Sequence, residues 1–168
     1  MGGIMKNIVL IGMPGSGKTT VSKLLSQQLC LPLIDIDEYI VDKYQQTIED
    51  MFNINEAYFR ERETICCQEV GLLDGYVLST GGGVIKNQVN IVALKQNGVI
   101  FLLDRSVENI IQDIETSTRP LLKEGKQKLY TLYEERHELY HQSADVVIDN
   151  NKEIVYTLKQ IIDYMESM

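Results

Sequence analysis

The sequence predicts an α/β fold in which a five-stranded parallel sheet is covered by helices on both faces. Short apolar segments alternate with amphipathic segments along nearly the whole chain, as in a series of strand-helix units. The apolar segments are almost continuously hydrophobic, which is typical of strands buried on both faces. At 168 residues, one domain spanning 1–168 is long enough to bury a core without disulfides or metal.

The first half of the chain predicts two strands and three helices. An apolar, β-rich run at 6–11 ends in glycine, and the helix expected at 18–29 has apolar residues three or four positions apart. A second short strand is expected at 33–36, followed by a short helix with Asp37 as its N-cap. Residues 55–73 then predict one longer helix.

The second half continues the alternation. Its expected elements are a strand at 76–79 that stops at three glycines, a helix at 87–96, a strand at 99–103, a helix that begins after Ser106, a helix that ends near 142, a strand at 145–148 and a C-terminal helix. The stretch 116–126 interrupts this order, because it is polar, contains proline and glycine, and has no periodicity. We expect a mobile loop there.

Composition excludes several classes of function. A net charge of −8 repels nucleic-acid backbones and anionic membrane surfaces, and no run approaches the roughly 20 apolar residues of a membrane span. The apolar N-terminus leads into a glycine-rich loop and not into a signal-peptidase cleavage site, so we do not expect a secretory signal peptide. The three cysteines lack metal-ligand spacing, so we expect reduced, small core residues in a cytoplasmic protein.

A phosphate-binding motif stands between the first predicted strand and the first predicted helix. Residues 12–19, GMPGSGKT, match G-x-x-x-x-G-K-[ST], in which glycines let backbone N–H groups face an anion at a helix N-terminus. We expect Lys18 to reach the β and γ phosphates and Thr19 to coordinate magnesium. The residues expected to bind the nucleotide are Pro14, Gly15, Ser16, Gly17, Lys18, Thr19 and Thr20.

A guanine-nucleotide switch is a poor alternative for this motif. The sequence contains no D-x-x-G, and its nearest approach to N-K-x-D is NKEI at 151–154. A nucleotide-dependent enzyme and a non-catalytic nucleotide-binding module both remain compatible with the loop alone.

Two carboxylates, Asp35 and Asp37, come at the end of the second predicted strand. Strand alternation places both side chains on the same side, beside the phosphate loop at the carboxyl edge of the sheet. One carboxylate could hold magnesium through water while the other accepts a hydroxyl proton. The alternative is an N-cap and a solvated charge.

Arginines in two helices are further candidates. Arg60 and Glu63 lie on one face of the predicted helix at 55–73, where an ordinary surface ion pair is an equally good explanation. Arg136 falls near the centre of an apolar stripe in its own helix, where a leucine is expected. Because burying a guanidinium is costly, Arg136 is either ion-paired in the core or lines a site for an anionic substrate.

The string HELYH at 137–141 matches the zinc-protease pattern H-E-x-x-H. His137 and His141 fall on the flank or outer face of the helix, and the chain has no third histidine. The extended pattern also fails, with Ala144 in place of glycine and Val147 in place of histidine. We interpret HELYH as a chance match on a solvated helix surface.

Two further features favour a ligand near the sheet edge. Gly81, Gly82 and Gly83 follow a strand, and three consecutive glycines favour close approach of the backbone to a ligand over a loose turn. Arg119, in the expected mobile loop, is either a solvated charge or a group that folds over phosphates when the loop closes.

Taken in order, these motifs resemble the shikimate kinase family nearly end to end. The resemblance rests on GMPGSGKTT at 12–20, LIDID at 33–37, Phe59-Arg60 with Glu63, STGGG at 79–83, TRPLL at 118–122 and Arg136 in EERHELY. It implies the P-loop kinase fold, similar to nucleoside monophosphate kinases, with a substrate-binding helical part at about 37–73 and a mobile lid at about 112–126.

The resemblance also implies a reaction and a role for each residue. The γ-phosphoryl group of ATP would pass to the 3-hydroxyl of shikimate, a step toward chorismate and the aromatic amino acids. Asp37 would act as the base, Lys18 and Arg119 would stabilise the phosphoryl group, and Mg²⁺ would be bound by Thr19 and by Asp35 through water. The shikimate-binding residues would be Asp37, Arg60, Gly81, Gly82, Gly83 and Arg136.

We expect the protein to work as a monomer with shikimate and ATP, without nucleic acid or membrane partners. One departure from the family pattern is Gln112, where several members place a basic residue against the nucleotide. The alternatives are another small-molecule P-loop kinase, of gluconate or nucleotide type, or a non-catalytic ATP-binding module.

Overall fold

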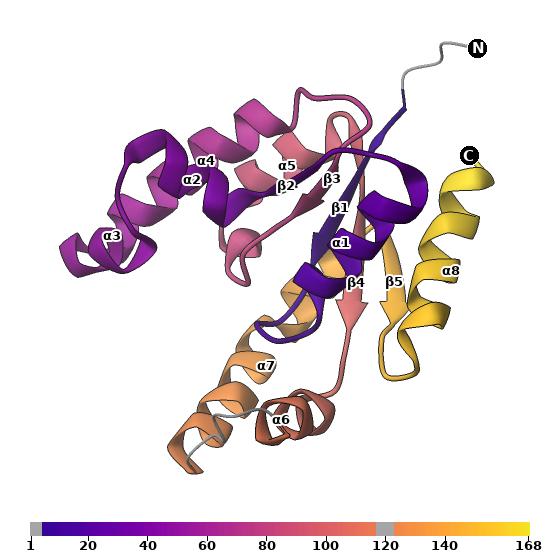
Figure 1. Ribbon diagram of the computed structural model, residues 1–168. Helices are drawn as coiled ribbons and strands as arrows, with labels where there is room; N and C mark the ends of the chain where they lie inside the picture. Colours follow the sequence, from indigo (N-terminus) through magenta and orange to yellow (C-terminus); the bar gives the residue numbers. More distant parts are fainter. Residues whose placement is uncertain (1–4, 117–122) are drawn as a thin grey trace.

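A parallel sheet organises the protein. The computed structural model describes residues 5–116 and 123–168, and within them the sheet has five strands in the order β2-β3-β1-β4-β5 (Figure 1). The strands are β1 (Asn7–Ile11), β2 (Leu33–Asp35), β3 (Val77–Ser79), β4 (Gly98–Asp104) and β5 (Val146–Asp149). Every pairing is parallel, which confirms the predicted fold class.

The central strand β1 is buried on both faces and fixes the register of its neighbours. Ile8 pairs with Val77 of β3 on one side and with Val99 of β4 on the other. Side chains of β1 alternate between two hydrophobic cores: Ile8 and Leu10 belong to one, and Val9 and Ile11 to the other. A strand with two buried faces must be apolar at every position, which explains the unbroken run in the sequence.

Helices cover both faces of the sheet. The core that contains Ile8 and Leu10 is completed by α1 (Lys18–Leu29) and α8 (Ile154–Glu166), which lie side by side. The other core takes side chains from α2 (Ile36–Tyr44), α3 (Ile48–Ile54), α4 (Glu56–Val70), the 3-10 helix η1 (Val84–Lys86), α5 (Gln88–Lys95), α6 (Val107–Glu115) and α7 (Lys123–Ser143). None of the helices described is both long and apolar enough to cross a membrane.

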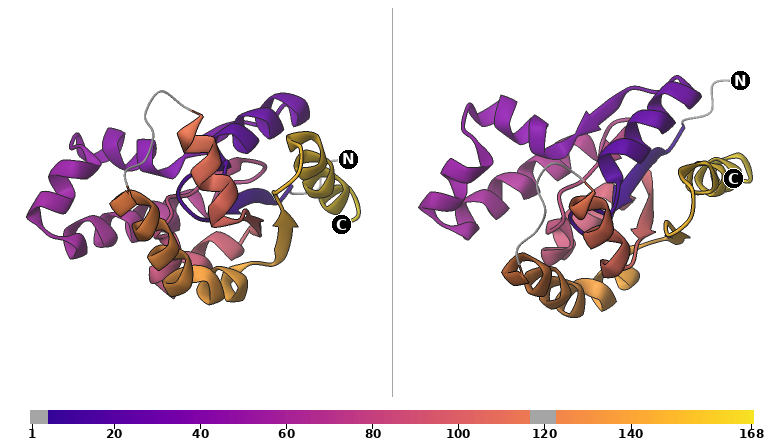
Figure 2. Two further views of the ribbon diagram at one scale, coloured as in Figure 1. Left: turned by 90° about the horizontal axis from the view of Figure 1, so that it is seen from below. Right: turned by 60° about the horizontal axis from the view of Figure 1, so that its bottom comes forward.

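The views show which helices approach the carboxyl ends of the strands. The arrowheads of β4 and β5 point toward the end of the molecule where α6 and α7 lie (Figure 1). The helices α2, α3 and α4 form a separate group on the β2 side of the sheet, and this group is visible from below as well (Figure 2). The carboxyl edge is therefore flanked by two groups of helices.

Most predicted elements are confirmed, but the structure differs from the prediction in local details. Residues 123–126, expected in a loop, form the start of α7, because a polar first turn needs no apolar periodicity to be helical. The sequence also gave no prediction of α3, a seven-residue helix that Thr47 caps by accepting a hydrogen bond from the backbone N–H of Asp50. The rest of the expected lid, residues 117–122, lies outside the described residues.

The cysteines differ in their surroundings. Cys66 and Cys67 are buried in α4, as expected for small core residues. Cys30 is exposed and ends α1 in the left-handed conformation, with a φ angle of 55°, so the expectation of a core position is wrong there. Its backbone N–H donates to the carbonyl of Ser26, and this bond, not a core contact, explains its position.

A buried asparagine connects the phosphate loop to the last helix. Asn150, just after β5, donates from Nδ2 to the Ser16 carbonyl at 2.7 Å and accepts from the Thr157 hydroxyl. All three residues are buried. Buried polar groups of this kind are stabilising while paired and costly when one partner is removed.

We therefore expect Asn150→Ala to lower the free energy of unfolding by about 2 kcal/mol, because it leaves the Ser16 carbonyl and the Thr157 hydroxyl without a partner. Urea denaturation measures this difference. Asn53→Ala is the matched control, since Asn53 is exposed and its loss should change stability by less than about 0.5 kcal/mol. Equal stabilities of the two variants would contradict a structural role for Asn150.

Candidate active site

The phosphate loop joins β1 to α1, as its sequence predicted. Gly15 and Gly17 have φ angles of 81° and 100°, a conformation that residues with a side chain rarely adopt. A Cβ on Gly17 would also lie 3.2 Å from Nδ2 of Asn150. The motif therefore needs glycine at position 17 for backbone conformation and for space.

Lys18 lies at the first position of α1, and its ammonium group is turned back into the loop. Nζ donates to the carbonyl oxygens of Gly12 at 2.6 Å and Met13 at 2.9 Å. Burial lowers the pKa of Lys18 from 10.5 to about 8, against the opposing effect of the Asp37 and Asp35 carboxylates. An ammonium held in this way is ready to pair with an anion at the loop.

Asp35 and Asp37 lie close together, but not for the reason that the sequence suggested. The strand ends at Asp35, which is itself the N-cap of α2 and accepts a hydrogen bond from Glu38 N at 3.1 Å. Asp37 is in the first turn of α2, so the predicted N-cap was wrong by two residues. The two carboxylates approach each other through the strand-to-helix turn instead of through strand alternation.

The Asp37 carboxyl group faces the glycine triplet. A Cβ on Gly81 would lie 3.0 Å from Oδ1 of Asp37, and that oxygen is buried without a hydrogen-bond partner. Burial raises the pKa of Asp37, and the Asp35 carboxylate raises it further, while Lys18 and Arg60 oppose the shift. The Oδ1 atom of Asp37 is thus unpaired, and the carboxyl group is directed toward the loop that follows β3.

Arg60 of α4 does more than form a surface ion pair. Its guanidinium donates to Glu63 Oε1 at 2.9 Å, and Glu63 is buried. A Cβ on Gly83 would lie only 2.4 Å from Nη2 of Arg60, so the guanidinium lies flat against the glycine backbone. Arg60 also contacts Glu56, with Nε 3.1 Å from Oε2. The glycine at position 83 makes room for the arginine.

Arg136 of α7 also approaches the glycine triplet. A Cβ on Gly82 would be 3.4 Å from its Nη1 atom, and the side chain is half-buried, as its place in the apolar stripe predicted. Tyr140, one turn further along α7, is buried and donates its hydroxyl to the Gly82 carbonyl. Arg136 is therefore directed at the glycine triplet, and no carboxylate among residues 5–116 and 123–168 forms an ion pair with it.

The structure thus brings together most of the predicted site residues at one edge of the sheet. These are the phosphate loop with Lys18, the carboxylates Asp35 and Asp37, the triplet Gly81, Gly82 and Gly83, and the guanidinium groups of Arg60 and Arg136. Thr19 and Thr20 are exposed in the first turn of α1. Arg119 lies outside the described residues.

Sequence reasoning missed part of the site. A cavity of about 220 Å³ adjoins the phosphate loop and is lined by Ser16, Gly17, Thr20, Arg105, Asn150 and Lys152, among others. Arg105 is held there by Asp113 at 2.9 Å and by the Asn150 carbonyl at 2.6 Å. Arg105 and Asn150 directly follow the carboxyl ends of β4 and β5, and this placement could have identified them from the sequence. Tyr140 is one turn after Arg136 on the same helix, and this spacing could have identified it.

Comparison with known proteins gives one consistent family. A family model described as shikimate kinase matches residues 14–166. A curated shikimate kinase of Clostridium botulinum (strain Alaska E43 / Type E3) is 44% identical over 162 residues, covering 94% of this chain and 98% of that protein. The solved structure of shikimate kinase from Acinetobacter baumannii in complex with shikimate superposes with a TM-score of 0.85 at 34% identity, covering 97% of this chain and 94% of the other.

Similarity of fold extends further than the family. A gluconokinase structure from Sinorhizobium meliloti 1021 has a TM-score of 0.60 at 15% identity, covering 98% of this chain and 93% of that one. At this identity the comparison shows a shared fold and nothing about the acceptor.

The low pKa of Lys18 gives a pH-dependent prediction for nucleotide affinity. In the free protein Lys18 loses its proton as the pH rises through about 8, whereas bound phosphates would keep it protonated. Binding then requires proton uptake, so we expect the Kd for ATP to rise by up to about tenfold per pH unit above pH 8. Titration with a fluorescent ATP analogue at several pH values measures the effect. In Lys18→Arg the Kd should stay nearly flat over this range, and an equally steep rise there would exclude Lys18 as its cause.

Proposed function

Because this chain belongs to the shikimate kinase family and is an ATP-dependent kinase, we propose that it transfers the γ-phosphoryl group of ATP to the 3-hydroxyl of shikimate. The products are shikimate 3-phosphate and ADP. One observation carries the acceptor assignment: a carboxylate, Asp37, and two guanidinium groups, Arg60 and Arg136, surround one glycine triplet. Such a group suits a small molecule that bears hydroxyls at one end and a carboxylate at the other.

Arg60 and Arg136 bind the carboxylate of the acceptor. A guanidinium offers several N–H donors in one plane, which matches the two oxygens of a carboxylate. Glu63 holds Arg60 in place, and burial raises the pKa of this glutamate while Arg60 lowers it. Glu63 is accordingly a positioning residue that acts through Arg60.

Asp37 binds the ring hydroxyls and takes the proton of the 3-hydroxyl during transfer. The unpaired Oδ1 atom is available to accept a hydrogen bond from a hydroxyl. The raised pKa of Asp37, caused first by burial, makes this carboxylate a stronger base than an exposed aspartate. Close approach of the acceptor is possible because Gly81, Gly82 and Gly83 present no side chains.

The nucleotide binds on the other side of Asp37. Backbone N–H groups of residues 15–20 surround the phosphates, Lys18 pairs with the β and γ phosphates, and Arg119 supplies a further positive charge. The nucleoside part enters the cavity beside Arg105, Asn150 and Lys152. Transfer then depends on holding both substrates in line and on neutralising charge, since phosphoryl transfer needs little covalent help from the protein.

Magnesium is the metal that these residues fit. The Thr19 hydroxyl is exposed at the first turn of α1, and Asp35 offers a carboxylate close enough to affect the pKa of Lys18. Hydroxyl and carboxylate oxygens are the donors that Mg²⁺ prefers, with water completing its shell. When bound, the ion neutralises phosphate charge, and the role of Thr19 and Asp35 is to hold it.

We also infer that the protein acts as a cytoplasmic monomer and needs neither nucleic acid nor membrane. Free thiols at Cys66 and Cys67, and ATP as a substrate, suit a reducing compartment. The helices α2 to α4 form the acceptor-binding part, and the lid lies around residues 112–126.

The proposal is tested by measuring ADP release from ATP and magnesium with three acceptors: shikimate, gluconate and AMP. Turnover with shikimate alone is expected, because AMP has no carboxylate for Arg60 and Arg136, and the open chain of gluconate does not hold its hydroxyls in a fixed position relative to its carboxylate. Turnover with gluconate or AMP but not with shikimate would support kinase activity and exclude shikimate as the acceptor. Binding of ATP without turnover on any acceptor would favour the non-catalytic module.

A single substitution tests the carboxylate clamp. We expect Arg136→Ala to raise the KM for shikimate by about 100-fold with little change in the KM for ATP, because one partner of the acceptor carboxylate is removed. Steady-state kinetics with each substrate varied in turn measures this.

Arg62→Ala is the matched control for Arg136→Ala. Arg62 lies two residues beyond Arg60 on α4 and packs over the Tyr58 ring at 3.3 Å, away from the glycine triplet. The KM for shikimate should be unchanged in this variant. An unchanged KM in Arg136→Ala as well would remove Arg136 from the site.

A further inference from the structure

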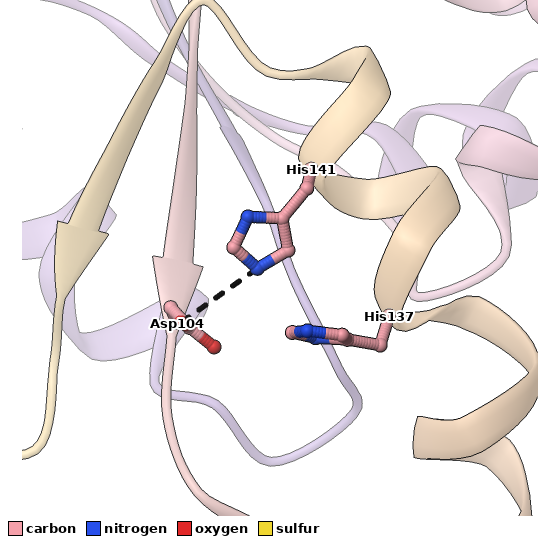
Figure 3. A group of neighbouring side chains, drawn as sticks. All are labelled: Asp104, His137 and His141. Atoms are coloured by element: carbon pink, nitrogen blue, oxygen red, sulfur yellow. Dashed lines mark ion pairs between the residues drawn. The ribbon is translucent and has the colours of Figure 1, made fainter.

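Two histidines of α7 and one aspartate of β4 form a cluster outside the proposed active site. His137 and His141 lie one turn apart on the helix, and both rings face Asp104 at the carboxyl end of β4 (Figure 3). One potential ligand atom from each residue lies within 4.8 Å of the other two. The structure therefore corrects the expectation of a solvated surface, since both histidines are half-buried and turned toward the sheet.

One buried nitrogen of this cluster lacks a hydrogen-bond partner among the described residues. Nε2 of His141 is buried and has no hydrogen-bond partner, and it lies 3.8 Å from Oδ2 of Asp104, beyond hydrogen-bond distance. An unpaired buried ring nitrogen opposite a carboxylate is unfavourable unless something bridges the two. A cation placed between them would satisfy both groups.

The rings are already oriented for a shared ligand. His137 stacks on Tyr133, with ring centroids 4.7 Å apart, and meets the edge of His141 at 4.4 Å. Bonds of about 2.0–2.2 Å to a tetrahedral metal place its ligands about 3.5 Å apart. The potential ligand atoms lie within 4.8 Å of one another, so binding would draw them together by about 1 Å.

From this geometry we propose that Asp104, His137 and His141 bind a divalent transition-metal ion of the zinc class, which fastens α7 to β4. Two imidazoles and one carboxylate are the donors of three-ligand zinc sites, in which water takes the fourth position. Imidazole favours zinc, cobalt and nickel, whereas Mg²⁺ prefers all-oxygen ligands, so the site is selective against the metal of the phosphate loop.

The site binds metal without hydrolytic activity. In zinc proteases with H-E-x-x-H, the glutamate acts as the base beside the metal. Here Glu138 is exposed and accepts a hydrogen bond from Gln142 at 3.4 Å on the helix surface. The third ligand comes instead from Asp104, which is distant in sequence and brought close by the packing of α7 on the sheet.

The consequence of binding is a firmer attachment of α7. Only Tyr140 and Ser143 are buried among its 21 residues, so most of the helix is held by partial contacts. Arg136 immediately precedes His137, and Tyr140 immediately precedes His141. A metal bridge to β4 would therefore fix the part of α7 that faces the glycine triplet.

The test uses the untagged chain with Cys30→Ser, so that the exposed thiol cannot bind the metal. The protein is stripped with a chelator, kept in millimolar Mg²⁺, and titrated with Co²⁺ and then with Zn²⁺. We expect visible cobalt absorption that saturates at one equivalent and disappears when Zn²⁺ is added. At about 100 times its Kd, Zn²⁺ should raise the Tm by about 5–10 °C.

Matched variants locate the site. His141→Gln and Asp104→Asn should each weaken Co²⁺ binding by about 100-fold, because each removes one of three ligands. Glu138→Gln changes the same helix without touching a ligand and should bind like its parent. If His141→Gln fails to fold, His137→Gln replaces it.

Two outcomes would overturn the metal site: no saturable cobalt absorption in the parent, or equal affinity in the parent, His141→Gln and Asp104→Asn. The result is independent of the proposed reaction, since none of the three ligands takes part in it.

Discussion

All strands of the sheet run in one direction, and the rest of the structure depends on this constraint. Parallel strands bring their carboxyl ends to a single edge, so the segments that follow β1, β2 and β3 must meet there. The phosphate loop, the Asp35 turn and the glycine triplet are those three segments. Residues that are far apart in sequence become neighbours because β1 is inserted between β3 and β4.

Collecting polar groups at a half-buried edge requires that their charges be balanced. Lys18 is surrounded by loop carbonyls with Asp35 and Asp37 nearby, and Arg60 is paired with the buried Glu63. Each pairing reduces the desolvation penalty of a charge that would otherwise be costly to bury. The pKa shifts of Lys18 and Asp37 record what remains of that penalty, since burial is the largest cause of both.

Local patterns predicted this fold well, and long-range packing explains where they were insufficient. Helix α1 was predicted to the residue, because glycine before it and apolar periodicity within it are both local features. The inward position of Arg136 also followed from a helical wheel. The N-cap of α2 was assigned to Asp37 because Asp35 and Asp37 are chemically equivalent candidates, and only the backbone of the turn distinguishes them.

The histidine pair shows the limit of sequence patterns most clearly. Its spacing was visible, but its environment was not, because Asp104 and the side of α7 that meets β4 are set by tertiary packing. The cavity beside Arg105 and Asn150 has the same origin, since it forms between segments after β4 and β5 and the phosphate loop. Helical periodicity locates a face of a helix, but it does not identify what that face meets.

The contact between Gly83 and Arg60 also limits which amino-acid substitutions the protein tolerates during evolution. Every substitution at codon 83 adds at least a Cβ atom, which would lie 2.4 Å from the guanidinium of Arg60 and displace it from the glycine backbone. Lys86, three residues later, is exposed, and its surface ion pair with Glu56 contributes little to stability. Neutral variation should therefore accumulate at position 86 while position 83 stays fixed, unless position 60 changes in the same lineage.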